Sequence, residues 1–367
     1  MASKSPGIAR LVGDLRRALA GVGAWPADRV AVAYSGGPDS GALLGGLLAC
    51  GCHPLVIHVD HGLRPESAAE AAAVVAFARR VGLPWAVARL SLAPGPNLAA
   101  RARAARYRHL VTLAKVHGVA TVLVGHTATD QAETVLLKAM RGAGLRGLAG
   151  MAPAFERDGV RFVRPLLADW SRAEVDEVAG QLAADFGLPL VRDPTNEDRR
   201  AARVFVRAEV LERLRRIAPR LDASIARSAQ DARDAAEAIA SWAEGEWSRR
   251  AFGAGDRLDV AGWDGLPRAV RREILIAFLG ARSAEAGPRR HGRIRPVIEA
   301  IDAAVLAGRT GTRFDVFGGR AVHLRHGDGG RVLQLESTSS AGTCPGPDRG
   351  RPPSEPRGTG AAGGGNH

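Results

Sequence analysis

An alternation of short apolar runs with helical segments, repeated between residues 30 and 141, constrains the fold of this chain more than any other feature. The apolar runs have the composition of buried strands: VAVAY (30–34), LVIHV (55–59), PWAVARL (84–90) and TVLVG (121–125). Helical segments follow them at 40–49, 66–82, 98–117 and 130–141. Parallel strands need long crossover connections, which helices supply. The pattern therefore predicts an α/β fold: a parallel sheet with helices on both faces, which binds ligands at the carboxyl ends of its strands.

The rest of the chain lacks this alternation, and shifts in its composition suggest further regions. We expect an N-terminal helix in residues 1–27, a catalytic domain in 28–196, a basic helical linker in 197–221, a smaller, mainly helical domain in 222–336 and a tail in 337–367. Residues 316–336, which end the helical domain, have the pattern of a small hairpin. The tail is dominated by Gly, Pro, Ser and Thr, a composition typical of disorder.

The charge balance points to a polyanionic partner without proving one. Lys and Arg together number 51 against 38 Asp and Glu, for a net charge of +13, and nearly all the basic residues are Arg. Arginine matches the geometry of phosphate, so nucleic acid is one interpretation. A GC-rich coding bias would give the same Ala-, Gly- and Arg-rich chain, so the charge alone leaves both open.

Cysteine usage and hydropathy exclude several classes of protein. Cys50, Cys52 and Cys344 form no CxxC pair, which argues against a disulfide scaffold and against a cysteine-ligated zinc or iron–sulfur site. No apolar run approaches the ~20 residues of a membrane span, and the N-terminus lacks the apolar core of a signal peptide. We therefore expect a reduced, soluble, cytoplasmic protein that does not associate with membranes.

The turn after the first strand has the features of a phosphate site. In AVAYSGGPDSGALL (31–44), a strand ends at Tyr34, a Ser-Gly-Gly turn follows and Ser40 opens a helix. Two glycines let backbone N–H groups crowd around an anion, and the helix N-terminus adds partial positive charge. The loop is not a Walker A motif, because GxxxxGK[ST] is absent. An ordinary strand–turn–helix connection with Ser40 as the cap would explain the glycines and Ser40, but not the whole pattern.

Two further motifs carry candidate binding residues, and a third matches a dinucleotide-binding motif in the wrong structural context. HVDHGLR (58–64) follows the second strand, where His58, Asp60 and His61 suit either nucleotide contact or a metal. Asp130 and Glu133 lie i and i+3 on one helix face, where they could hold Mg²⁺, position an amine or simply favour the first helical turn. Residues 142–147 satisfy GxGxxG but follow a helical segment, whereas a dinucleotide-binding loop must follow a strand.

The glycine turn SGGPDS resembles the PP-loop of the N-type ATP pyrophosphatases, which cleave ATP between the α- and β-phosphates. The order of the motifs resembles a narrower group, the tRNA(Ile)-lysidine synthetase family, over residues 28–220. The motifs that carry this resemblance are SGGPDS, HVDHGLR, ARAARYRHL (102–110), GHTATDQAET (125–134), RGAGLRGLAGM (141–151), RPLL (164–167) and DPTNEDRRAARVFVR (193–207). The C-terminal third resembles the family much more loosely.

The resemblance implies a reaction and a set of roles. The family uses ATP and Mg²⁺ to adenylate the wobble cytidine of tRNA(Ile) with a CAU anticodon; the side-chain amine of L-lysine then attacks C2, and decoding changes from AUG to AUA. Carried over to this chain, the resemblance implies that the phosphates of ATP are bound by Ser35, Gly36, Gly37, Pro38, Asp39 and Ser40, and its adenosine side by His58, Asp60 and His61. It implies that the catalytic residues are Asp39, Asp130, Glu133 and Arg103, with Asp39 also binding Mg²⁺. It implies that tRNA is contacted by Arg106, Arg164, Arg203 and Arg207. Asp130 and Glu133 would orient the lysine ammonium and help it lose its proton. Small members of the family are commonly dimeric, which suggests a homodimer.

Several positions depart from the family pattern. Thr127 and Thr129 stand where a His and the first of two Asp residues are usual, Val204 replaces an Asn and Glu212 replaces a Pro. The loss of a carboxylate at Thr129 suggests an alternative, a catalytically silent tRNA-binding paralogue. A PP-loop tRNA thiolase is a second alternative, against which the missing CxxC pair argues. A free-standing amide synthetase is a third, but it would not need a basic second half.

Overall fold

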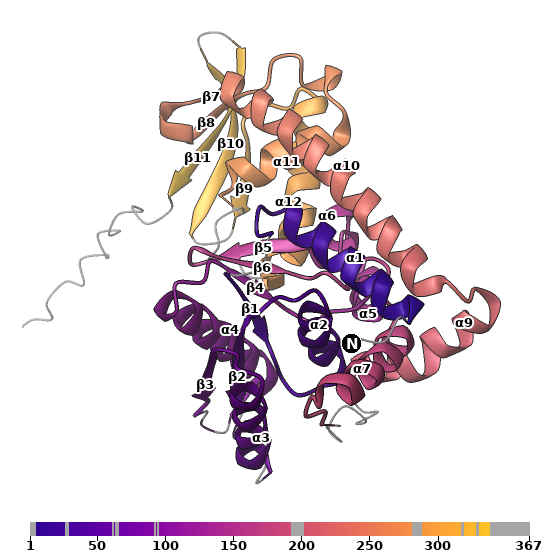
Figure 1. The fold of residues 1–367 in the computed structure, drawn as a ribbon. Helices are drawn as coiled ribbons and strands as arrows, with labels where there is room; N and C mark the ends of the chain where they lie inside the picture. The colour runs from indigo at the N-terminus through magenta and orange to yellow at the C-terminus, as the bar shows by residue number, and fades with distance from the viewer. Residues whose placement is uncertain are drawn as a thin grey trace, which may run out of the picture. The chain divides into compact units, whose positions relative to one another are not determined.

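The computed structural model describes residues 5–25, 29–60, 62, 66–91, 93, 95–191, 202–280, 288–316, 319–327 and 330–337 (Figure 1). The chain forms two compact units, Met1–Ala238 and Ile239–His367. His61, residues 193–201 and the predicted disordered tail beyond residue 337 lie outside the described residues.

The first unit is built on a six-stranded, mostly parallel sheet in the order β3-β2-β1-β4-β6-β5. Its strands are β1 (Val30–Ala33), β2 (Leu55–Asp60), β3 (Trp85–Arg89), β4 (Thr121–Leu123), β5 (Ala154–Arg157) and β6 (Val160–Val163). The first four are the strands that the alternation predicts, and the fold class is confirmed. Only β5 is antiparallel, and with β6 it forms a hairpin that the sequence analysis did not predict. Strand β1 lies between β2 and β4, so its carboxyl end lies inside the sheet rather than at an edge.

Helices cover both faces of this sheet. The helices of the first unit up to residue 186 are α1 (Pro6–Ala20), α2 (Pro38–Ala49), α3 (Ser67–Arg80), α4 (Leu98–Val116), α5 (Ala128–Ala139), α6 (Leu145–Leu148) and α7 (Arg172–Phe186). One apolar core joins α1, α2 and α7 to the sheet through fully buried residues such as Leu15, Leu44 and Leu182. A second core packs α4 on the sheet through Leu110 and the aromatic ring of Phe162. Because both faces are covered, the parallel strands are apolar almost throughout.

A helical segment returns to α5 after these elements. It consists of α8 (Ala202–Phe205), a π-helix η2 (Val206–Leu211), α9 (Glu212–Ile217) and the long α10 (Leu221–Arg250). A small apolar cluster of Ala132, Val206 and Leu211 fixes η2 against α5. The two compact units divide inside α10, whereas the shifts in composition predict a domain boundary at residue 222, near the beginning of this helix.

The second unit combines helices with an antiparallel sheet. Its main helices are α11 (Arg268–Phe278) and α12 (Pro288–Leu306), with short 3-10 turns η3 (Gly253–Gly255) and η4 (Trp263–Gly265). The sheet has the order β7-β8-β11-β10-β9, with strands β7 (Ala251–Phe252), β8 (Arg257–Asp259), β9 (Thr312–Val316), β10 (Arg320–Gly327) and β11 (Gly330–Ser337). β10 and β11 form the hairpin expected in residues 316–336, and β7, β8 and β9 extend it. Throughout the described residues, no helix has both the length and the apolarity needed to cross a bilayer.

Candidate active site

The loop between β1 and α2 is held in one conformation by its own side chains. The Ser40 hydroxyl donates to the Gly37 carbonyl at 2.9 Å and accepts from the Ser35 amide at 3.1 Å. Gly36 has φ +84°, a conformation that side chains with a Cβ rarely adopt, and its carbonyl accepts from the Val191 amide at 2.8 Å. The loop therefore presents the N-terminus of α2 at the carboxyl end of a central strand, an arrangement that favours a phosphate.

His58 and Asp60 lie on the neighbouring strand β2; His58 contacts the end of β1, and Asp60 contacts the turn that follows β2. His58 is buried, and its Nδ1 is 2.9 Å from the Tyr34 carbonyl at the end of β1. Because a carbonyl only accepts, Nδ1 carries the proton in this contact. Asp60 accepts from the Gly62 amide at 2.8 Å. Burial tends to raise the pKa of Asp60, but this amide and nearby donors hold it below its usual value.

Asp39, in the first turn of α2, is the carboxylate nearest to the loop. Burial raises its pKa to about 6, a shift that Arg172 opposes and Asp130 reinforces. Its Oδ1 is buried and has no hydrogen-bond partner among the described residues. Gly125, just after β4, lies against it: a Cβ on Gly125 would be 2.8 Å from the Asp39 carbonyl carbon. Close approach of the two backbones thus places Asp39 between the loop and the end of β4.

Asp130 is buried at the N-terminus of α5. Its Oδ2 accepts from the Thr127 amide at 3.0 Å, and the Thr127 hydroxyl caps the helix in return. The pKa of Asp130 is lowered: burial raises it, but the Thr127 amide, Arg172 and Arg203 outweigh burial. Thr127, where the family usually has His, therefore serves as a capping residue that keeps Asp130 ionised.

Asp130 and Glu133 join Asp39 in a cluster with three arginines, which we call the carboxylate–arginine cluster. The members are Asp39, Asp130, Glu133, Arg172, Arg203 and Arg207. Nη2 of Arg172 lies 3.3 Å from Asp39 Oδ2 and 3.8 Å from Asp130 Oδ1. Three carboxylates and three guanidinium groups balance in charge, which is how buried ions are tolerated in a protein interior.

Glu133 is the most deeply buried member, with 0% of its side chain exposed. Arg203 Nε donates to Glu133 Oε2 at 2.5 Å, and Arg207 Nε donates to Oε1. The resemblance assigns Arg203 and Arg207 to tRNA, whereas here both are hydrogen-bonded to this carboxylate. Arg207 lies in the π-helix η2, a feature often found at functional sites.

A second group of arginines lies around aromatic rings rather than carboxylates. The guanidinium groups of Arg103 and Arg106 lie 5.3 and 5.6 Å from the centre of the Tyr107 ring, and Arg164 lies 4.3 Å from that of Phe155. Arg106 Nε is buried without a hydrogen-bond partner among the described residues, and burial lowers the pKa of this guanidinium. Arg164 Nε is 3.3 Å from Nδ1 of His126. Cations held this way attract an anion.

The site residues predicted from the sequence thus fall into separate sets. The loop, Asp39, Asp130 and Glu133 come together with Arg203 and Arg207. Arg103, Arg106 and Arg164 form the aromatic set. His61 lies outside the described residues.

The donor set of Asp39 fits a hard cation. Among the described residues, no three His, Cys, Asp or Glu side chains are grouped so as to hold a metal ion. Mg²⁺, however, is usually bound through one or two carboxylates, with substrate phosphates and water as its other ligands. Oδ1 of Asp39 has no hydrogen-bond partner in the described part of the chain and lies beside a phosphate-type loop, which matches that requirement.

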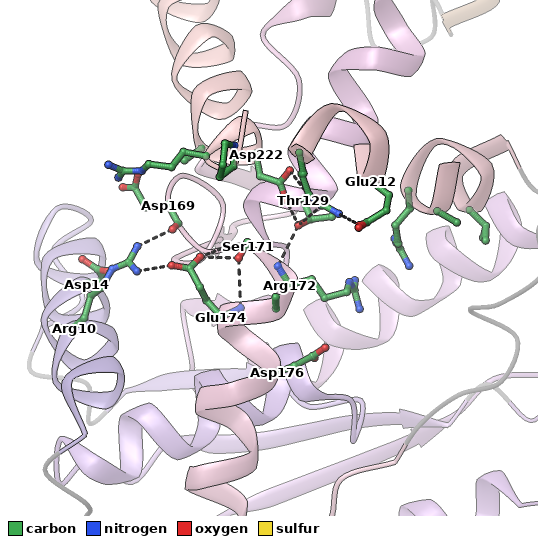
Figure 2. Close-up of a pocket in the computed structure, with 18 of the residues that line it drawn as sticks. Arg10, Asp14, Thr129, Asp169, Ser171, Arg172, Glu174, Asp176, Glu212 and Asp222 are labelled. Atoms are coloured by element: carbon green, nitrogen blue, oxygen red, sulfur yellow. Dashed lines mark hydrogen bonds and ion pairs between the residues drawn. The ribbon is translucent and has the colours of Figure 1, made fainter. Parts of the chain in front are cut away.

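A cavity of about 1100 Å³ adjoins the cluster, and sequence reasoning missed it (Figure 2). Residues from α1, α5, α7, η2, α9 and the beginning of α10 line it. Ser171 and Glu174 form a capping box at the N-terminus of α7, so that Arg172 is the first residue of that helix. The S-x-x-E spacing at 171–174 is a sequence signal for such a terminus and could have drawn attention to Arg172.

Comparisons with known proteins agree with this architecture. The PP-loop domain family matches residues 13–214. A tRNA(Ile)-lysidine synthase of Bordetella parapertussis is 40% identical over 262 residues, which cover 70% of this chain and 76% of the relative. The enzyme of Methylobacterium nodulans is 39% identical, and the match covers 83% of this chain and 90% of the relative. The enzyme of Thermobifida fusca is also 39% identical, and the match covers 87% of this chain and 96% of the relative.

A solved structure shares the fold. The U34-tRNA thiolase NcsA from Methanococcus maripaludis, with its [4Fe-4S] cluster, superposes with a TM-score of 0.51 at 19% identity, over 62% of this chain and 80% of that one. At this identity the likeness extends to the fold alone. Sequence identity near 40% over most of the chain, together with the PP-loop and the α5 carboxylates, places this protein in the tRNA(Ile)-lysidine synthase family.

Proposed function

We propose that this protein ligates L-lysine to C2 of the wobble cytidine of tRNA(Ile) with a CAU anticodon. In the first step the cytidine O2 attacks the α-phosphorus of ATP and pyrophosphate leaves. In the second, the lysine side-chain amine attacks C2, loses a proton and displaces AMP. The observation that carries the proposal is the position of Asp39, which lies between the PP-loop and the buried carboxylates of α5 in a chain of this family.

The loop supplies the ATP site in this proposal. Ser35–Ser40 and the N-terminus of α2 bind the phosphates, and Asp39 Oδ1 is the ligand for Mg²⁺. An ion held by Asp39 would supply positive charge to the phosphates and to the departing pyrophosphate. His58 and Asp60 hold the ends of the strands on which the adenosine side rests.

Asp130 is the better placed of the two α5 carboxylates to receive the lysine amine. Among the described residues, its Oδ1 has only longer contacts, of 3.4 to 3.9 Å, to Arg172, Arg203 and Arg207, whereas both oxygens of Glu133 already accept short hydrogen bonds. We therefore assign orientation of the ammonium group to Asp130, whose lowered pKa keeps it negatively charged. Glu133 fixes Arg203 and Arg207 beside it, so that these arginines can face phosphate groups of ATP or tRNA.

Arg103, Arg106 and Arg164 are suited to binding the phosphate of a tRNA nucleotide whose base has left the anticodon-loop stack. Their cationic groups lie among Tyr107, Phe155 and His126, and an unstacked base has an affinity for aromatic rings as well as cations. An anticodon loop offers an unstacked base at low cost. A cytoplasmic location stays a prediction from cysteine usage and hydropathy, and a homodimer stays a prediction from the resemblance.

Incorporation of labelled lysine tests the proposal. A tRNA(Ile) transcript with a CAU anticodon is incubated with ATP, Mg²⁺ and the protein, beside Asp39→Asn and a tRNA(Met) control. We expect label at the wobble cytidine with the wild type and a loss of at least about 100-fold with the variant, the size found when a preorganised electrostatic group is removed. A folded wild type that binds tRNA but releases neither AMP nor pyrophosphate would instead identify a catalytically silent paralogue. Transfer of sulfur to the tRNA would identify a thiolase.

A further inference from the structure

Thr129 is buried on α5, next to the carboxylate–arginine cluster, and it hydrogen-bonds to a carboxylate from a distant part of the chain. Its hydroxyl donates to Asp222 Oδ2, in the first turn of α10, at 2.5 Å (Figure 2). Asp222 is 5% exposed. Position 129 therefore has no carboxylate of its own, but a buried one is supplied beside it by α10.

Arg215 of α9 neutralises this carboxylate. Its Nη2 lies 2.7 Å from Asp222 Oδ2, and its Nε donates to Oδ1 at 3.2 Å. The same Nη2 lies 3.4 Å from the Thr129 hydroxyl. A buried carboxylate with a two-point contact to one guanidinium has a fixed position, because both partners are held in a planar geometry.

The Thr129 hydroxyl also accepts from the backbone amide of Arg172, at 3.1 Å. This amide belongs to the first residue of α7, whose N–H has no partner within its own helix. The side chain of Arg172 in turn lies between Asp39 and Asp130. Asp222, Thr129 and Arg172 thus form a continuous path from α10 to the two carboxylates on which the proposed reaction depends.

We propose that Asp222, held by Arg215, is a positioning residue: through Thr129 it fixes Arg172 between Asp39 and Asp130, in place of a carboxylate at position 129. The inference rests on the proposed function. It predicts that position 129 and position 222 share one negative charge and that either position can carry it. Thr129→Asp would place a carboxylate where the Arg172 amide and Arg215 already donate hydrogen bonds. This new carboxylate would be repelled by the negative charge of Asp222 as long as Asp222 is present.

The test is an exchange of the charge between the two positions, measured as kcat for lysine incorporation at saturating ATP, lysine and tRNA. We expect Asp222→Asn and Thr129→Asp each to lower kcat by about 10- to 100-fold, since small displacements of catalytic groups have effects of this size. The double variant Thr129→Asp/Asp222→Asn should recover to within about fivefold of the wild type. A folded Asp222→Asn with wild-type kcat, or a double variant no better than Asp222→Asn, would overturn the inference.

Asp302→Asn separates positioning from stability. Asp302 forms a comparable pair with Arg271, at 2.8 Å, in the other unit, so its loss should lower the unfolding temperature and leave kcat unchanged. If Asp222→Asn does not fold, Thr129→Val and Thr129→Ser replace it: the hydroxyl-bearing Ser should keep the wild-type kcat and Val should not. Equal kcat for Ser and Val would refute the path.

Binding of Mg·ATP separates this inference from the proposed function. If the wild type incorporates no lysine, the proposed function fails, but Asp222→Asn should still bind Mg·ATP more weakly than Asp302→Asn does in calorimetry. Under that outcome, equal affinities for the two variants would overturn the positioning role as well.

Discussion

Gly125 and Asp39 are in backbone contact: a Cβ on Gly125 would lie 2.8 Å from the carbonyl carbon of Asp39 and 3.0 Å from its Cβ. The end of β4 and the first turn of α2 can approach this closely only because position 125 has no side chain. The location of Asp39 therefore depends on a residue that performs no chemistry.

Gly125→Ala should displace Asp39 and lower lysine incorporation by about 10- to 100-fold, because the contact is with backbone that cannot rotate away. Gly180→Ala is the matched control: position 180 is inside α7, and a Cβ there meets nothing within 4 Å. It should raise stability by about 0.5–1 kcal/mol, the usual gain for Gly to Ala in a helix. Full activity in Gly125→Ala would show that Asp39 tolerates displacement.

Glu133→Gln should destabilise the first unit by about 2–4 kcal/mol, because it leaves two guanidinium groups partly buried without their shared counter-charge. Urea unfolding of the protein measures this. Glu299→Gln removes a carboxylate from an exposed pair with Arg295, at 2.9 Å, and should leave the unfolding midpoint unchanged. If the two variants are equally stable, the Glu133 pairs are not structural.

His126 predicts how stability depends on pH. Burial, helped by Arg164, Arg106 and Arg103, lowers its pKa to about 3, against the pull of Asp130. Between about 3 and 6.5 the unfolded chain therefore binds a proton on this ring that the folded chain does not, and stability falls as pH is lowered through this range. Between pH 7.5 and 5, the wild type should lose about 1–2 kcal/mol more than His126→Asn. An identical loss in both would place the titration elsewhere.

Arg106 predicts how tRNA affinity depends on salt. If its guanidinium contacts a phosphate, Arg106→Gln should weaken binding and reduce the slope of log K against log salt by about 0.7–0.9. Filter binding at several potassium chloride concentrations measures the slope. Arg79→Gln is the comparison: it removes a guanidinium of α3 that lies over the Trp85 ring of β3, and its slope should equal that of the wild type. Equal slopes for both variants would remove Arg106 from the tRNA contacts.

The parallel sheet could be predicted because strands covered on both faces are mostly apolar, and because each of the first four is followed by a helix. The loop, Asp130 and Glu133 were likewise visible, since glycine spacing and an i,i+3 pair are local signals. The β5–β6 hairpin and most of the second sheet were not, because their short strands are partly exposed and lack a sustained apolar run.

The partners of the carboxylates were beyond local reasoning. Glu133 meets Arg203 and Arg207, and Thr129 meets Asp222, only because η2, α9 and α10 pack back on α5. Sequence spacing alone does not reveal such pairings. The assignment of Arg203 and Arg207 to tRNA rests on the R-x-x-x-R spacing of the family, and such a spacing does not show which carboxylate the two side chains contact in the fold.

The burial of Glu133 between two distant arginines has a consequence for biosynthesis. Until Arg203 and Arg207 have left the ribosome, the Glu133 carboxylate lacks these two counter-charges and cannot be buried without a large cost in free energy. The sheet and PP-loop can be translated and collapse earlier, but the reaction centre closes only when residues up to Asp222 have emerged. A nascent chain stalled before that point would hold a folded nucleotide loop beside an open, incomplete centre.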